Sequence, residues 1–174
     1  FDGRDLTGFI DGTENPQFPD DRAATTLLGE NSGVFADGSF IFAQRYCHDL
    51  EKWKKLKVDA QEQVFGRTKL ESIELDDDVK PENSHVARVV VEDDEGEEME
   101  ILRHSLPYGD GKGEQGLFFI AYTKDLNIID AMLLRMFGTS GDGIHDRMLH
   151  FVTPVDGAYY FAPSEELLEE VLEG

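Results

Sequence analysis

A carboxylate in a glycine-rich loop is the first residue of this chain that could carry out chemistry. Asp11 lies in the segment GFIDGTENP, between an apolar pair and Gly12, where the backbone can turn sharply and approach a ligand closely. An aspartate in this position can act as an acid or a base toward a bound molecule. Asp-Gly is also a common turn in which the aspartate only caps its own backbone. These residues alone leave both interpretations open.

His85 is the candidate metal ligand among five histidines. It follows an irregular loop and opens an apolar segment that we expect to be a strand, so its ring could point into a cavity as an axial haem ligand does. An ordinary structural role is the alternative for any lone histidine. With one cysteine and no HExxH pair, the sequence predicts neither an internal disulfide nor a zinc site.

Arg103 is the candidate cation. It lies in the apolar segment ILRHSLPYG, where a guanidinium is costly to bury without an anionic partner. A structural salt bridge explains such a residue, and so does a site that binds or stabilises negative charge. The segment does not decide between the two.

The elements that must position these residues alternate between strands and helices. We expect a strand over residues 39–48, two short helices within 49–65 that end at Gly66, and an amphipathic helix over 126–137. Further strands are expected over 86–91, 99–106, 116–123, 148–153 and 158–161, with a helix after Ser164 and loops over 8–29 and 75–83. This pattern predicts an α+β fold of ferredoxin-like type, an antiparallel sheet with helices on one face.

Composition narrows the class of partner. The chain has 174 residues, 16 of them basic and 37 acidic, and its formal net charge is −21. So acidic a surface repels nucleic acids and anionic membranes. No apolar run has the roughly 20 residues that a membrane span needs, and no secretory leader precedes the first motif. We therefore expect one domain over residues 1–174, with no nucleic-acid or membrane partner and, from its one cysteine, a cytoplasmic location.

Four segments together resemble a known family. GFIDGTENP, NSHVAR, EILRHSLPYG and GLFFIAYTKDL occur in the order and at the spacings of the C-terminal half of dye-decolourising peroxidases, and the resemblance covers nearly the whole chain. That family has two related ferredoxin-like domains. The resemblance implies that the chain is the haem-binding C-terminal domain and that an N-terminal domain is absent from the sequence.

The resemblance assigns the residues that touch iron and peroxide. The family's GxxDG motif is met by Gly8, Asp11 and Gly12, which makes Asp11 the distal carboxylate. The proximal haem ligand, and hence the metal ligand, falls on His85. The distal arginine falls on Arg103, which would serve in both catalysis and cofactor binding.

Four further cofactor-binding residues follow from the same resemblance. Ser105 would line the distal pocket and Phe119 would form its aromatic roof. Arg67 would pair with a haem propionate, and Asp146 would accept a hydrogen bond from the proximal histidine.

The function implied by the resemblance is that of a peroxidase that uses haem b, reduces hydrogen peroxide and oxidises dyes or other small organic reductants, in a homo-oligomer. A haem-handling protein without peroxide turnover is one alternative. A fragment that binds haem poorly until a partner domain completes the cavity is another.

Overall fold

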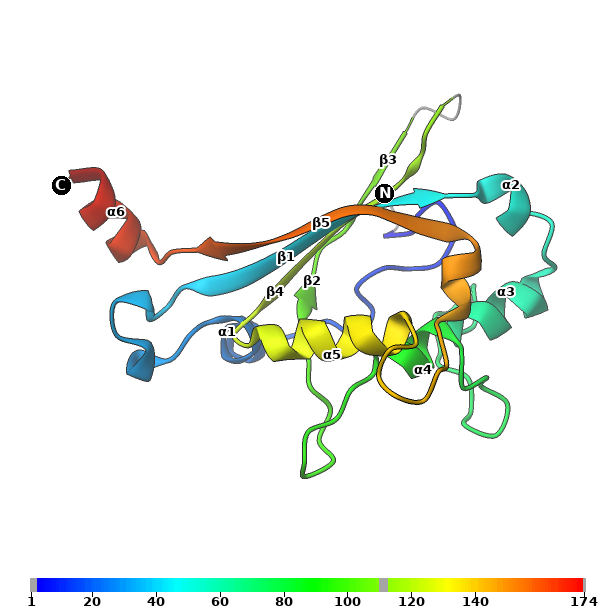
Figure 1. The fold of residues 1–174 in the computed structure, drawn as a ribbon, viewed down its shortest axis with the longest axis horizontal. Helices are drawn as coiled ribbons and strands as arrows, with labels where there is room; N and C mark the ends of the chain where they lie inside the picture. Colours follow the sequence, from blue (N-terminus) through cyan, green and yellow to red (C-terminus); the bar gives the residue numbers. More distant parts are fainter. Residues whose placement is uncertain (1–2, 110–112, 174) are drawn as a thin grey trace.

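The fold has an antiparallel sheet with helices packed against one of its faces (Figure 1). The computed structural model describes residues 3–109 and 113–173. The strands are β1 (Ser39–His48), β2 (Leu102–Arg103), β3 (Leu106–Tyr108), β4 (Gly116–Thr123) and β5 (Val152–Ala162). The helices are α1 (Pro19–Thr26), α2 (Leu50–Trp53), α3 (Val58–Phe65), α4 (His85–Val89), α5 (Leu126–Met136) and α6 (Glu165–Glu173), with 3₁₀ turns η1 (Glu30–Phe35) and η2 (Arg147–His150). The predicted ferredoxin-like α+β fold is confirmed.

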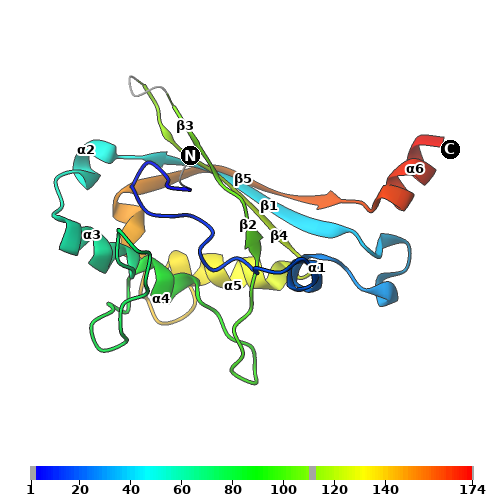
Figure 2. The same cartoon turned by 180° about the vertical axis from the view of Figure 1, so that it is seen from behind.

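β1 is the central strand of the sheet. It pairs with β4 on one side and β5 on the other, so that Phe42 lies opposite both Ala121 and Tyr159. β2 and β3 both pair with β4 and extend its outer side. Because side chains alternate between the faces of a strand, Phe42, Tyr46 and Phe119 share the face that α3, α4 and α5 cover (Figures 1 and 2).

α5 covers one half of this face, as its sequence predicts. Asp125 caps the helix by accepting a hydrogen bond from the amide of Asn127, and the apolar side chains of Ile128 and Ile129 pack against Phe42 and Ala121. The helix therefore sets the spacing between the sheet and the helical layer at this end.

α2 and α3 close the other half and follow the predicted pair of short helices. Asp49 caps α2 through the amide of Lys52, and Gly66 ends α3 in the left-handed conformation at φ 94°. Trp53 of α2 is buried in edge-on contact with Phe9, and Phe9 stacks on the ring of Phe65. These contacts tie the N-terminal loop to α3.

The strand expected over 86–91 is wrong, because this segment contains helix α4. Ser84 caps the helix by accepting a hydrogen bond from the amide of Ala87. α4 is then held against α5, since the guanidinium groups of Arg88 and Arg135 each donate to the other residue's carbonyl. The valines of this segment favour a strand locally, and tertiary packing overrides that preference.

Three other boundaries differ from the prediction. Residues 19–26, expected as loop, form α1, whose first turn has Pro19 and two aspartates that suit a helix N-terminus. The strand expected over 99–106 is reduced to the short strands β2 and β3. The two strands expected over 148–153 and 158–161 are instead one strand, β5, which follows the turn η2.

Among the described residues, no helix is long and apolar enough to cross a bilayer.

Candidate functional site

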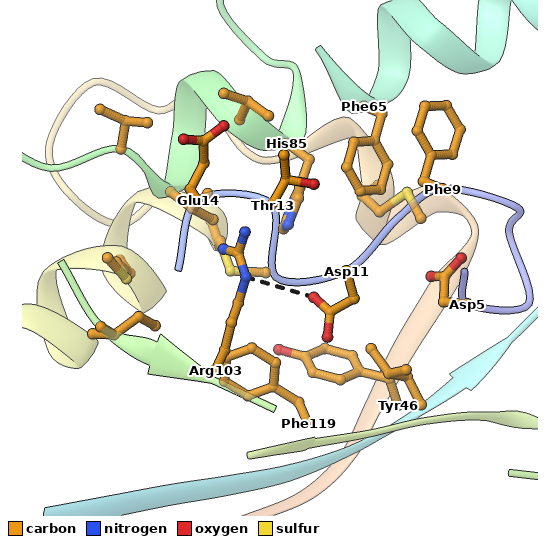
Figure 3. Close-up of a pocket in the computed structure, with 18 of the residues that line it drawn as sticks. Asp5, Phe9, Asp11, Thr13, Glu14, Tyr46, Phe65, His85, Arg103 and Phe119 are labelled. Atoms are coloured by element: carbon orange, nitrogen blue, oxygen red, sulfur yellow. Dashed lines mark ion pairs between the residues drawn. The ribbon is translucent and has the colours of Figure 1, made fainter. Parts of the chain in front are cut away.

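A pocket lies between the sheet and the helical layer and collects most of the predicted site residues (Figure 3). His85 reaches it from α4, whereas Arg103 and Phe119 reach it from β2 and β4. Its remaining wall is largely apolar and includes Phe9, Phe42, Phe65, Val86, Val90, Ile101, Leu117, Ile129, Met132 and Met136. Apolar walls with a few convergent polar groups are typical of a cofactor or small-molecule site.

His85 is oriented by a buried carboxylate. Its Nδ1 lies 2.6 Å from Oδ2 of Asp146, whose side chain is 0% exposed. The other oxygen of Asp146 accepts a hydrogen bond of 2.7 Å from the amide of Met148 and so caps η2. Within residues 3–109 and 113–173, none of the hydrogen bonds of the His85 ring involves Nε2. When a carboxylate accepts the proton of Nδ1, Nε2 has no proton and points away from the carboxylate. Its lone pair can then bind a metal, as in metal-ligating histidines.

Opposite the helical layer, Asp11, Arg103 and Ser105 form a polar cluster on the sheet side. Nε of Arg103 lies 3.5 Å from Oδ1 of Asp11, and the amide of Ser105 donates to Oδ2 of Asp11 at 3.2 Å. Nε of Arg103 and Oγ of Ser105 are buried without a hydrogen-bond partner in the described part of the chain. Ser105, expected in the pocket lining, is not among the lining residues and reaches the cluster through its backbone.

The loop that carries Asp11 is clamped to β2 by Asn15. The Asn15 side chain accepts a hydrogen bond from the amide of Arg103 at 3.0 Å and donates to its carbonyl at 2.7 Å. Gly12 has φ 71°, and a Cβ at this position would lie 2.8 Å from Nδ2 of Asn15. The DGTEN sequence thus allows a turn that brings Asp11 and Arg103 together. We did not predict the role of Asn15.

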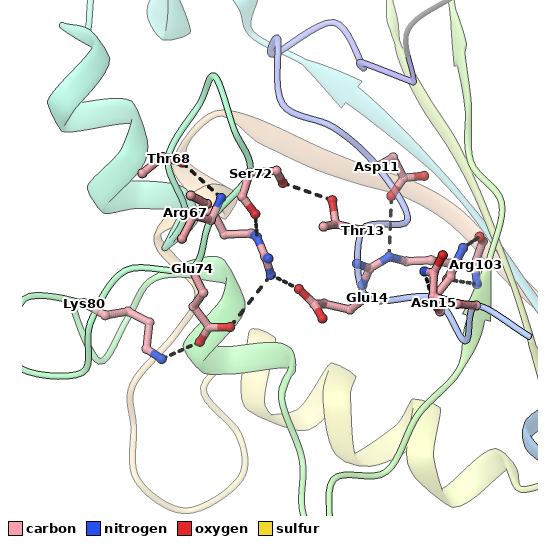
Figure 4. Close-up of polar contacts among 12 residues, drawn as sticks. Asp11, Thr13, Glu14, Asn15, Arg67, Thr68, Ser72, Glu74, Lys80 and Arg103 are labelled. Carbon is pink, nitrogen blue, oxygen red and sulfur yellow. Dashed lines mark hydrogen bonds and ion pairs between the residues drawn. The ribbon is translucent and has the colours of Figure 1, made fainter. Parts of the chain in front are cut away.

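Arg67 is buried at one edge of the pocket, where it contacts two acidic residues (Figure 4). Its Nε donates to the carbonyl of Ser72 at 2.8 Å, and its Nη1 forms an ion pair with Glu14. A carboxylate oxygen of Glu74 lies 3.8 Å from the same Nη1. The structure therefore places Arg67 at the pocket with an anionic partner already bound.

Two polar residues of β1 that were not predicted as site residues also line the pocket. Tyr46 donates a hydrogen bond of 2.5 Å to Gln44, and burial raises the pKa of its phenol. His48 has no partner for Nδ1 among the described residues, and burial lowers its pKa to about 4. Their even spacing on β1 with Phe42 was the available signal, because it puts all three on one face of the strand.

Comparison with known proteins identifies the family and the fold of the chain. The family model described as "Dyp-type peroxidase, C-terminal" matches residues 2–167. The chain belongs to the DyP-type peroxidase family. It is 47% identical to a dye-decolourising peroxidase of Mycobacterium tuberculosis over 97% of this chain, and that match covers 50% of the relative.

Solved structures of the family have the same fold. DyPB from Rhodococcus jostii superimposes with a TM-score of 0.92 at 46% identity, over 97% of this chain and 54% of DyPB. The encapsulated DyP-type peroxidase from Mycobacterium smegmatis gives a TM-score of 0.92 at 46% identity, over 98% of this chain and 55% of that protein. The chain therefore spans about half the length of the relatives that it matches.

The half-buried His48 of the pocket predicts a pH dependence of stability. Because burial lowers the pKa of His48 from 6.5 to about 4, the unfolded chain binds more protons than the folded chain between these values. The contribution of His48 to stability is therefore complete above pH 6.5 and is lost as the pH falls toward 4. We expect the free energy of unfolding of His48→Gln, measured in urea, to depend less on pH in this window than that of the wild type. The exposed His104→Gln should keep the wild-type slope, and an unchanged slope in His48→Gln would contradict the assignment.

Proposed function

We propose that this chain is the haem-binding domain of a peroxidase that reduces hydrogen peroxide at the expense of an organic reductant. The observation that carries the proposal is the arrangement of two polar pairs, His85–Asp146 from the helical side and Asp11–Arg103 from the sheet side, around one apolar pocket. An axial ligand on one side and an acid–base group with a cation on the other are what peroxide activation needs.

The residues of the pocket fit a haem, which we take to be haem b. A DypB variant of Rhodococcus jostii has been solved in complex with haem. In this chain, Nε2 of His85 would hold the iron, and Asp146 would fix the ring and increase its donor strength. The buried guanidinium of Arg67 would pair with a propionate, and Phe119 would lie against the distal side of the ring. When bound, the haem supplies the electrons that reduce peroxide.

Haem also suits the types of residue present better than a metal bound by protein groups alone. Among the described residues, no group of three or more His, Cys, Asp or Glu side chains could hold a metal ion. A haem needs only one axial ligand from the protein, because the porphyrin supplies four nitrogens. The largely apolar wall also matches a large hydrophobic ring.

The distal residues have complementary roles in this proposal. Asp11 can accept a proton from hydrogen peroxide and return it to the departing oxygen, which leaves as water. Arg103 can stabilise the negative charge that develops on that oxygen, because its Nε is buried without a hydrogen-bond partner in the described chain. Asn15 and the amide of Ser105 hold these two groups in place.

The net charge and the cysteine content of the chain suggest its reductants and its location. The negative charge of the chain favours neutral or cationic reductants over anionic ones. One cysteine in 174 residues supports a cytoplasmic location, since disulfides are rare there. That the protein forms a homo-oligomer is still only a prediction from the family resemblance.

The axial role of His85 can be tested by spectroscopy. We expect the 174-residue chain to bind haem with a Soret band that His85→Ala loses or strongly weakens, and that shifts in the wild type after one equivalent of hydrogen peroxide. The exposed His104→Ala serves as the matched control and should behave like the wild type. An identical Soret band in His85→Ala would rule out the axial role, and a band that does not respond to peroxide would favour a haem-handling protein.

The distal roles can be separated by single replacements. We expect Asp11→Asn and Arg103→Leu each to slow the reaction of the haem-loaded chain with peroxide by about 10²- to 10⁴-fold in stopped-flow measurements. Haem occupancy should stay near the wild-type level. The matched controls are Asp156→Asn and Arg45→Leu, an ion pair on β5 and β1 outside the pocket, which should leave the rate unchanged. A wild-type rate in either distal variant removes that residue from the mechanism.

A further inference from the structure

The anion-binding face of Arg67 is occupied in the structure by a residue of the chain itself. Nη1 of Arg67 forms an ion pair with Glu14, which follows Asp11 on the same loop (Figure 4). Both side chains line the pocket. A carboxylated ligand that approaches Arg67 from the pocket must therefore compete with Glu14.

Glu14 is the partner of Arg67 that can leave most readily. The side chain of Glu14 is 51% exposed, whereas that of Arg67 is 9% exposed, so water can solvate the carboxylate once it turns away. Because a buried cation without a partner is costly, the incoming carboxylate must take the place of Glu14 as Glu14 turns away. Glu74, in contrast, lies farther from Arg67 at 3.8 Å and is held by Lys80 at 2.5 Å.

The backbone around Glu14 does not have to move for this exchange. Oγ of Thr13 and Oγ of Ser72 are 3.0 Å apart, which ties the loop to the segment after Arg67. Asn15 is bonded to both backbone groups of Arg103. Only the side chain of Glu14, between these two fixed neighbours, has to rotate. The exchange would thus leave the Asp11–Arg103 pair in place.

Other carboxylates make this edge of the pocket acidic. Glu98 and Glu100 also line it, and the pKa of Glu98 is raised by burial and by the nearby charges of Glu14 and Glu100. A ligand that brings carboxylates to Arg67 therefore meets repulsion as well as competition. Removing the charge of Glu14 reduces both effects.

We propose that Glu14 is an exchangeable counter-ion of Arg67, which a carboxylate of the incoming ligand displaces, so that Glu14 limits how tightly the pocket binds a dicarboxylic porphyrin. This inference rests on the proposed function, because it takes the ligand to be haem. Glu14 is in this account a positioning residue that acts through Arg67. It neutralises a buried cation while the pocket lacks its ligand.

The test compares two iron porphyrins that differ only in their carboxylates. Iron protoporphyrin IX and its dimethyl ester are titrated into the 174-residue chain in the same mixed solvent, and affinity is measured from the Soret band. We expect Glu14→Gln to bind the diacid about 3- to 10-fold more tightly than the wild type and to bind the diester equally well. Glu114→Gln, which removes a carboxylate that pairs with Arg45 away from the pocket, should bind both porphyrins as the wild type does.

A second variant locates the effect. In an Arg67→Met background, Glu14→Gln should no longer increase the affinity for the diacid, because the competition is for Arg67. An unchanged or weaker affinity of Glu14→Gln for the diacid overturns the inference, and so does an equal gain for both porphyrins. In both cases a His85-dependent Soret band leaves the proposed function intact. If no variant binds either porphyrin, the proposed function fails and the inference fails with it.

Discussion

The buried carboxylate of Asp146 is the constraint on which the site depends. A carboxylate that no water reaches is costly unless its oxygens have hydrogen-bond partners. Here one oxygen contacts Nδ1 of His85 and the other accepts from the amide of Met148, so Asp146 joins the first residue of α4 to η2. α4 is fixed again by its reciprocal contacts with α5. The imidazole is therefore held by two elements that lie far apart in the sequence.

The two layers of the fold divide the chemistry between them. The helical layer presents His85, β2 presents the guanidinium of Arg103, and the N-terminal loop presents the carboxylate of Asp11. Apolar side chains from both layers separate these groups and leave space for a flat hydrophobic ligand. The sheet side is as constrained as the helical side, because Asn15 clamps the Asp11 loop to the backbone of Arg103. Contacts within the chain thus fix the polar groups on both sides of the pocket.

Local sequence patterns predicted β1, β4, α5 and the pair of short helices α2 and α3, but they missed α4 and divided β5 into two strands. β1, β4 and α5 have enough residues for their periodicity to be recognised, and the caps at Asp49 and Asp125 mark where helices begin. α4 was mistaken for a strand because five residues rich in valine carry little helical periodicity. Its signal was the capping residue, Ser84. η2 was missed for a different reason, because its cap, Asp146, was interpreted only as a partner of the histidine.

The local sequence identifies some residues of the site but not the contacts between them. Asp11, His85 and Arg103 stand out by residue type and surroundings, but nothing local shows that they meet. His85 and Asp146 are 61 positions apart, and Asn15 and Arg103 are 88 apart. Such pairs depend on the tertiary fold, so the family resemblance was needed to suggest the first, and the second was not predicted. Glu14 was overlooked because an exposed glutamate in a loop gives no sign of a buried cation beside it.

The proposed action of Asp146 on a haem iron through His85 can be measured by the iron–histidine stretching vibration. Resonance Raman spectra of the ferrous, haem-loaded chain should show this band in the wild type. A carboxylate that accepts the Nδ1 proton strengthens the bond from Nε2 to iron. We therefore expect a band at lower frequency in Asp146→Asn. A band at the wild-type frequency in Asp146→Asn, or no such band in the wild type, would rule out this role of Asp146.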